Sequence, residues 1–381
     1  MQGVEEFRSE VRDWLAENLV GEFAALKGLG GPGREHEAFE ERRAWNQHLA
    51  HAGLTCLGWP VEHGGRGLSV AHRVAFYEEY AIANAPAKVN HFGEELLGPT
   101  LIAFGTPEQQ QRFLPRILDV TELWSQGYSE PGAGSDLANV STTAVLDDDE
   151  WVINGQKVWT SLAHWAQWCF VVARSEKGSK RHAGLSYLLV PLDQPGVEVR
   201  PIVQLTGDSE FNEVFFDDAR TDADLVVGQP GDGWRVAMGT LTFERGVSTL
   251  GQQIVYAREL SAVVELAKST GAADDPLIRE RLTRSWAGLR AMRSYALATM
   301  DVEQPGQDNV SKLLWANWHR DLGEIAMDVQ GKAGLVLTGG DFDEWQRLYL
   351  FTRADTIYGG SNEIQRNIIA ERVLGLPREA R

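Results

Sequence analysis

The hydrophobic pattern of this 381-residue chain changes its period twice, and this change limits the chain to an α+β multidomain fold. Residues 1–120 carry apolar side chains at helical spacing, beginning with Phe7 and Val11. Residues 121–230 instead contain short apolar runs of strand length, separated by turn signals. Helical spacing returns over residues 231–381, and its long apolar stripes are typical of a helical bundle. We therefore expect a β domain between two helical ones.

Local signals refine this division. A helix is expected to begin at Thr106-Pro107, because threonine can cap it and proline fits its first turn. Cys169–Ala173 and Leu185–Val190 have the pattern of buried strands. Turns are expected at three pairs that contain glycine: Asn154-Gly155, Pro195-Gly196 and Gly207-Asp208. The glycine-rich stretch Gly28–Gly33 is expected to be a flexible surface loop.

Charge and composition exclude several classes of function. The formal net charge of −18 argues against general nucleic-acid binding, but a phosphorylated small ligand needs only a local cluster of cations and amides. We find no apolar run long enough for membrane insertion, and the acidic N-terminus lacks the pattern of a secretion signal, so a cytoplasmic location is expected. Cys56 and Cys169, the only cysteines, are far apart, and no spacing suggests a metal site.

Two segments, Gln126–Leu137 and Asn154–Ser161, carry most of the chemical information. The first is a tight turn rich in amides and hydroxyls, and it lacks the third glycine of the dinucleotide fingerprint. Taken alone, it could equally be a Gly-Pro turn beside a strand. Taken together, the two segments closely resemble the flavin-binding segments of the acyl-CoA dehydrogenase family.

This resemblance extends over nearly the whole chain. Gly58–Gly67 and Gly105–Gln109 are similar to parts of the family's N-terminal domain, and Thr356–Arg366 is similar to its C-terminal signature. The motifs occur in the right order and at the right distances. The resemblance implies an N-terminal α-helical domain, a middle β-barrel or sandwich domain and a C-terminal four-helix bundle over the three stretches above.

The resemblance also implies that FAD is the cofactor. The residues carried over from the two segments are Gln126, Tyr128, Ser129, Ser135, Trp159 and Ser161. The cofactor-binding residues carried over from the C-terminal part are Lys268, Gln330, Gly334, Ser361 and Glu363. In the family, the tryptophan packs against the flavin edge, and fixed N–H and O–H donors stabilise the charge of the reduced flavin.

The C-terminal residues also have local interpretations that need no cofactor. Gly334 could lie at the end of a helix, and Ser361 could cap the last helix with Glu363 in its first turn. Both interpretations can hold together, because a helix N-terminus is also an anion site. Lys268 stands where relatives carry the arginine of an Arg-x-Thr-Phe-Gly stretch, and it offers charge without bidentate geometry.

The implied reaction is the α,β-desaturation of an acyl-CoA thioester to the trans-2-enoyl-CoA. Many family members place the catalytic glutamate directly after the Ile-Tyr of the C-terminal signature, where this chain has Gly359. Isovaleryl- and long-chain-type members take it from a bundle helix, just before an arginine, and Glu244-Arg245 is similar to that motif. Glu244 is therefore expected to be the base, with hydride transfer to flavin N5. By itself, the motif could equally be a solvated helix face.

Substrate-binding roles are expected for Arg245, Ser135 and Gly359. The backbone amide of Gly359 would donate a hydrogen bond to the thioester carbonyl as enolate character develops. Burial would raise the pKa of Glu244 toward the operating pH, which suits a base. Arg245 could hold Glu244 in place or approach the CoA, and a histidine placed like His164 is more often structural than chemical.

The family implies that the partners are acyl-CoA, electron-transferring flavoprotein and further copies of the chain in a homodimer or homotetramer. A second hypothesis is a non-catalytic or half-site subunit of a hetero-oligomer, motivated by Gly359 and Lys268. A third is an oxidase or monooxygenase on the same fold. Fatty-acid β-oxidation is the expected setting, and the sequence does not identify the acyl group.

Overall fold

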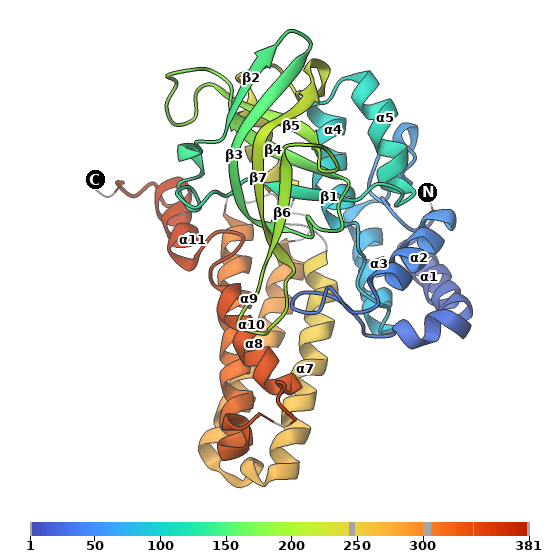
Figure 1. The fold of residues 1–381 in the computed structure, drawn as a ribbon. Helices are drawn as coiled ribbons and strands as arrows, with labels where there is room; N and C mark the ends of the chain where they lie inside the picture. The colour runs from blue at the N-terminus through green and yellow to red at the C-terminus, as the bar shows by residue number, and fades with distance from the viewer. Residues whose placement is uncertain (1, 244–247, 300–305, 338, 379–381) are drawn as a thin grey trace. The chain divides into compact units, whose positions relative to one another are not determined.

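The structure is a computed structural model that describes four stretches: residues 2–243, 248–299, 306–337 and 339–378. The chain divides into two compact units. Unit 1 comprises Met1–Glu17, Val70–Asn84 and Val247–Arg381. Unit 2 comprises Asn18–Ser69 and Ala85–Gly246. Along the chain, helices come first, strands follow and helices return, which confirms the expected order (Figure 1).

The centre of unit 2 is a seven-stranded sheet. Its strands are β1 (Trp124–Gly127), β2 (Thr143–Asp147), β3 (Glu150–Ser161), β4 (Trp168–Arg174), β5 (Leu185–Pro191), β6 (Val197–Ile202) and β7 (Phe211–Asp222). The strand order is β1-β4-β2-β3-β7-β6, and β5 also pairs with β4. β1 and β4 are parallel, whereas β3 pairs with β7 and β4 with β5 in antiparallel register. The two apolar runs expected to be strands are confirmed as the centres of β4 and β5.

Both faces of β4 and β5 are buried, which explains why their apolar runs are continuous. Phe170 and Tyr187 point into one core cluster together with residues of the helices, whereas Val171 and Leu188 point into the other. The helices of unit 2 are α2 (Phe39–His51), α4 (Gly98–Phe104), α5 (Pro107–Leu118) and α6 (Gly233–Phe243). The helix expected at Thr106-Pro107 is confirmed as α5, with a complete capping box.

One predicted turn is wrong. Asn154-Gly155 lies inside β3, at an irregularity in its pairing with β7, and not between two strands. A Cβ at Gly155 would lie 2.5 Å from Thr142 Oγ1, so this glycine permits a close approach between neighbouring strands. The Asn154 side chain accepts a hydrogen bond from Asp218 N and donates one to Asp218 Oδ1. Here tertiary packing overrides a local turn signal.

Unit 1 is helical. Its helices are α1 (Val4–Asn18), α3 (Val70–Ile82), α7 (Ser248–Thr270), α8 (Pro276–Thr299), α9 (Gln307–Gln330), α10 (Glu344–Asp355) and α11 (Asn362–Ile368). α7 to α10 run side by side in the bundle (Figure 1) and enclose a core that includes Val263, Leu289 and Leu322. Trp286 belongs to the apolar stripe of α8, yet its side chain is exposed.

Ion pairs between arginines and two buried carboxylates of α3 connect α1, α3 and α8. Arg8 on α1 donates to Glu78 Oε2 at 2.7 Å, and Arg12 donates to Glu79 Oε2 at 2.9 Å. Arg293 on α8 also donates to Glu78. These residues line a groove of about 820 Å³, whose other lining residues come mainly from α7 and α8 and include both apolar and polar side chains. Within the described stretches, no helix has both the length and the hydrophobicity needed to span a bilayer.

Candidate active site

In unit 2, the two motif segments lie side by side. The N–H of Val158 donates to the Ser129 carbonyl at 2.9 Å, so the chain beyond β1 is bonded to β3. Lys157 is completely buried beneath this contact. Its Nζ lies 2.8 Å from Glu130 Oε1 and donates to the Tyr128 carbonyl at 3.1 Å. The buried ammonium of Lys157 thus connects the turn at Ser129–Gly132 to β3, the strand that carries Trp159.

Glu130 holds the other side of the turn. Its carboxylate accepts the backbone N–H groups of Ser141 at 2.6 Å and Thr142 at 2.9 Å. Burial alone would raise the pKa of Glu130, but the charge of Lys157 and these hydrogen bonds outweigh burial and lower the pKa to about 2. Glu130 and Lys157 lie within the two motif segments, but neither was predicted to be functional. The inward position of a lysine in an alternating strand was the available signal.

Trp159 is the exposed aromatic residue of this arrangement. The pairing of β3 with β7 is irregular between Lys157 and Thr160, and Trp159 there has a φ of +59°. Its side chain is 57% exposed and meets the Phe211 ring edge-on at 6.0 Å between centroids. An exposed indole face on a rigid strand fits a planar ring system.

The other expected residues of unit 2 differ in how they could contact a cofactor. Gln126 Nε2 is buried and has no hydrogen-bond partner within the described residues, so it fits an acceptor on a bound group. Ser135 is exposed, and Ser161 ends β3. The Tyr128 ring, in contrast, packs against Phe170 in the core, so any contact of Tyr128 with a cofactor would involve its main chain.

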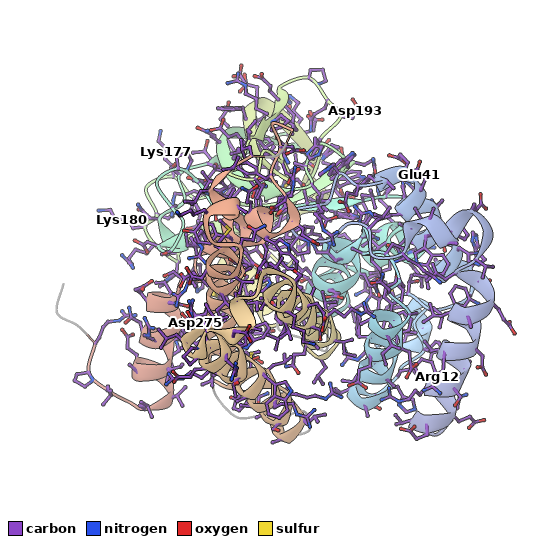
Figure 2. All side chains as sticks on the ribbon, turned by 90° about the horizontal axis from the view of Figure 1, so that it is seen from below. Arg12, Glu41, Lys177, Lys180, Asp193 and Asp275 are labelled. Carbon is purple, nitrogen blue, oxygen red and sulfur yellow. The ribbon has the colours of Figure 1, made fainter. Side chains whose placement is uncertain are left out.

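A basic loop, residues 175–184 between β4 and β5, lies beside the segment that contains Ser135. Arg174 holds it by donating to the carbonyls of Ala183 at 3.1 Å and Val140 at 3.3 Å. Arg181 pairs with Asp136 at 3.5 Å. The exposed cations of the basic loop are Lys177, Lys180 and Arg181. Figure 2 labels Lys177 and Lys180, which form no ion pair with the described residues. This positive charge is local in a chain whose net charge is −18.

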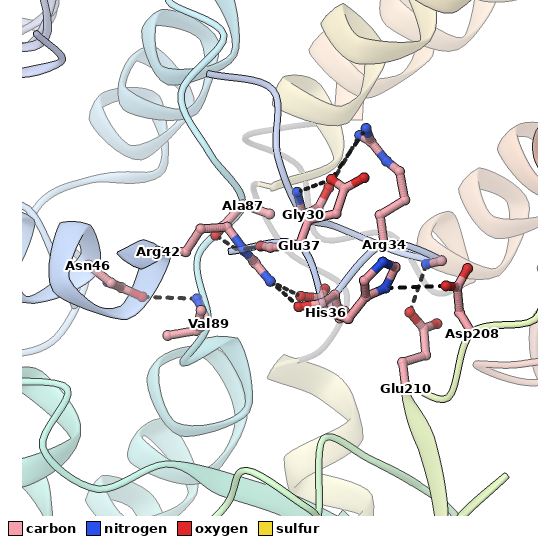
Figure 3. A network of polar contacts seen from close by, with 12 residues as sticks. Gly30, Arg34, His36, Glu37, Arg42, Asn46, Ala87, Val89, Asp208 and Glu210 are labelled. Carbon is pink, nitrogen blue, oxygen red and sulfur yellow. Dashed lines mark hydrogen bonds and ion pairs between the residues drawn. The ribbon is translucent and has the colours of Figure 1, made fainter. Parts of the chain in front are cut away.

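The glycine-rich stretch near residue 30 is not the surface loop that was expected. Gly30, Gly31 and Gly33 are buried, and the Gly33 N–H donates to Glu210 Oε2 at 2.7 Å (Figure 3). Glu210 directly precedes Phe211. Burial raises the pKa of Glu210 to about 7; the Gly33 N–H opposes this shift, and the nearby carboxylates of Glu35 and Asp208 add to it.

In unit 1, the expected donor Gly359 lies in a turn between α10 and α11. The fully buried Gln365 donates to the carbonyls of Gly359 at 2.8 Å and Gly360 at 3.2 Å. Asn309 donates to Gln365 Oε1 at 2.6 Å. Gly359 is exposed, and its own N–H bonds to no described residue. This N–H is therefore available to a ligand, as an oxyanion donor must be.

Ser361 caps α11 as expected, because its hydroxyl accepts the Ile364 N–H at 3.4 Å. Glu363 is exposed in the first turn of that helix. Gln330 donates to Asp343 Oδ2 at 2.7 Å, and its Oε1 is buried without a partner among the described residues. Gly334 is buried in the segment that follows Gln330.

Lys268 is exposed near the end of α7 and pairs with Glu265 at 2.6 Å. His164 Nδ1 donates one hydrogen bond to Asn212 Oδ1 at 3.0 Å. Glu244 and Arg245 lie outside the described residues. Among the described residues, no group of acidic, histidine or cysteine side chains could hold a metal ion.

The chain belongs to the acyl-CoA dehydrogenase family and is an oxidoreductase of that class. The family's N-terminal domain matches residues 2–121, its middle domain residues 125–219 and its C-terminal domain residues 231–374. Acyl-CoA dehydrogenases bind FAD. The acyl-CoA dehydrogenase IpdE1 of Mycolicibacterium smegmatis is 87% identical to this chain over 99% of both sequences.

Two solved structures are also similar over nearly the whole chain. The Tcur3481-Tcur3483 steroid ACAD has a TM-score of 0.84 and 29% identity, and the alignment covers 99% of this chain and 98% of that one. The ChsE4-ChsE5 complex from Mycobacterium tuberculosis has a TM-score of 0.82 and 30% identity, with the same coverage. Both comparisons support the expected helical, β and helical fold.

Proposed function

We propose that this chain catalyses the FAD-dependent α,β-desaturation of an acyl-CoA thioester, with Glu244 as the base. The observation that carries the proposal is the pair of motif segments held together by Lys157 and Glu130, which presents Trp159 as an exposed aromatic face. The family relationship supplies the reaction type.

FAD fits the groups that are present. Trp159, Gln126 and the hydroxyls of Ser129, Ser135 and Ser161 would hold its flavin side. Lys268, Gln330, Gly334, Ser361 and Glu363 are the proposed contacts with the rest of the cofactor. When bound, FAD supplies the two-electron acceptor for the reaction. Electron-transferring flavoprotein is the acceptor that we propose downstream.

The residues of the chain then handle the proton and the developing charge. Glu244 would remove the proton from the α carbon, while the Gly359 N–H donates to the thioester oxygen. Because this donor belongs to the main chain, it survives the replacement of the family's glutamate by glycine at position 359. Arg245 would hold Glu244 or approach the CoA.

The basic loop would receive the phosphates of CoA. Its cations lie beside Ser135 through the Arg181–Asp136 pair, and CoA is the polyanionic part of the substrate. For the acyl group we propose a bulky ring system, because a structural neighbour at 29% identity is described as a steroid ACAD. The proposed setting is therefore the degradation of a ring-bearing acyl-CoA and not of a linear fatty acid.

Anaerobic titration of the yellow protein tests the proposal. A ring-bearing acyl-CoA should bleach the flavin of the wild type, and the variant Glu244→Gln should bind flavin but bleach at least about a thousandfold more slowly, since the amide cannot accept the proton. Glu41→Gln, a change of the same type at an exposed position, should bleach normally. A Glu244→Gln variant that bleaches at the wild-type rate would show that the base is elsewhere.

A second candidate function is that of one subunit of a hetero-oligomeric enzyme. The neighbours described as Tcur3481-Tcur3483 and as the ChsE4-ChsE5 complex favour it, as does a lysine at position 268. Expression of the chain alone discriminates between the two candidates. A colourless protein that acquires flavin and activity only with a partner chain supports the second, whereas a yellow, active homo-oligomer supports the first.

A further inference from the structure

A charged cluster lies inside the bundle of unit 1, outside the motifs considered so far. His319 on α9 is 7% exposed and lies between two carboxylates. Its Nδ1 is 2.7 Å from Asp355 Oδ2, and its Nε2 is 2.9 Å from Glu259 Oε2. The Tyr256 ring packs against the imidazole, with 4.4 Å between centroids. Three bundle helices, α7, α9 and α10, meet at this histidine.

The cluster continues toward the turn that holds Gly359. The Tyr358 hydroxyl donates to Asp355 Oδ1 at 2.6 Å, so both oxygens of this buried carboxylate have a partner. Lys312 donates to the Asp355 carbonyl at 2.7 Å, and its Nζ lies 4.3 Å from the centroid of the Tyr358 ring. Side-chain contacts therefore connect Glu259 on α7 to the residue that precedes Gly359.

This connection bears on a single peptide group. The Gly359 N–H belongs to the peptide unit between Tyr358 and Gly359. On one side of that unit, Asp355 anchors the Tyr358 side chain; on the other, Gln365 holds the Gly359 carbonyl. Because a peptide unit is planar, fixing the groups on both sides restricts the directions that the N–H can take.

A purely structural role would not require charges here. Burial alone would lower the pKa of His319, but its hydrogen bonds with Asp355 and Glu259 and their charges outweigh burial and raise it to about 9. The cluster is thus an imidazolium between two carboxylates at neutral pH. Apolar side chains of similar volume commonly stabilise a core as well as buried ions do, so such a cluster is better explained by the geometry that it imposes.

We propose that His319 is a positioning residue for the desaturation: through Asp355 and Tyr358 it aims the Gly359 N–H at the thioester carbonyl. The inference rests on the proposed function, because it takes Gly359 as the oxyanion donor. A misdirected donor weakens transition-state stabilisation while leaving substrate binding nearly unchanged.

The test compares two variants in the full-length, flavin-loaded protein. Tyr358→Phe removes only the hydroxyl that bonds to Asp355, and His319→Gln removes the charge that orders both carboxylates. Tyr349→Phe is the control, because the Tyr349 hydroxyl makes no hydrogen bond with the described residues. Each protein is measured by deuterium exchange of peptides covering residues 356–361 and by the rate of anaerobic flavin bleaching over a range of acyl-CoA concentrations.

Tyr358→Phe is expected to keep its flavin, to exchange faster at residues 356–361 and to bleach about tenfold more slowly at saturation, with the half-saturating concentration changed less than about twofold. His319→Gln should exchange still faster at residues 356–361 and bleach still more slowly than Tyr358→Phe. Tyr349→Phe should exchange and bleach like the wild type. If His319→Gln fails to fold, the results for Tyr358→Phe alone test the proposal.

Wild-type exchange in Tyr358→Phe, or faster exchange with an unchanged bleaching rate, would overturn the proposal. A wild type that bleaches with no thioester would instead overturn the proposed function, and the exchange data would still report whether His319 holds the turn.

Discussion

At the scale of single residues, buried carboxylates determine more of this protein than the motifs suggest. Glu130 joins two chain segments, Asp355 anchors a turn, and Glu210 holds the backbone of Gly33. The partners of Glu130 and Glu210 could not be predicted from the sequence, because these contacts join segments that meet only after folding, whereas Asp355 and Tyr358 are only three residues apart. The sequence suggested a flexible loop near Gly33, since glycines signal conformational freedom and do not reveal the carboxylate that removes it.

Glu210 makes the stability of the protein depend on pH. The pKa of Glu210 is raised from 4.5 to about 7 in the folded state, because burial favours the protonated carboxyl. The protonated carboxyl therefore contributes fully to the free energy of unfolding below pH 4.5, and this contribution is lost as the pH rises through 7. Glu210→Gln keeps an acceptor for the Gly33 N–H but cannot ionise. We expect the variant to be more stable than the wild type by about 3 kcal/mol at pH 8, and to show no such gain at pH 4.5.

Urea unfolding at both pH values measures this difference. Glu41→Gln is the control, because Glu41 is exposed on α2 (Figure 2) and should show no pH-dependent gain. Equal stabilities of Glu210→Gln and the wild type at pH 8 would mean that Glu210 is not buried as described.

At the scale of elements, helix starts were predictable and strand irregularities were not. The caps at Thr106 and Ser361 are confirmed because a cap is a local interaction within four residues. Asn154-Gly155 was predicted to be a turn, but pairing with β7 keeps it inside a strand. The basic loop was not predicted to be functional, since its position beside the Ser135 turn depends on Arg174 and on the Arg181–Asp136 pair.

The basic loop leads to a prediction about substrate affinity. Lys180→Glu places a negative charge where the phosphates of CoA are proposed to bind. The half-saturating acyl-CoA concentration should rise about fivefold to tenfold at low salt, with the saturating rate nearly unchanged, because exposed charges act on binding and not on the chemical step.

The same kinetics at high salt should show a smaller difference, because added ions screen exposed charges. Lys27→Glu, an equal change of charge at another exposed position of unit 2, serves as the control and should leave the half-saturating concentration within about twofold. If Lys180→Glu behaves like this control, CoA does not bind at the basic loop.

At the scale of the whole molecule, the order of helices, strands and helices follows from the period of the hydrophobic pattern, and the family relationship agrees with it. The compact units do not follow that linear order, because α1 and α3 belong with the C-terminal helices in unit 1. Glu78 and Glu79 explain this grouping: they bind arginines from helices that are distant in sequence.

The sequence by itself determined the fold class, the family and the residues of the motifs, because hydrophobic period and motif spacing are properties of the linear chain. The tertiary structure alone decided how Lys157 and Glu130 join two motifs, how Glu210 fixes a glycine-rich stretch, and how His319 reaches the turn at Gly359. Buried ions need partners, and those partners come from whichever segments folding brings within about 3 Å.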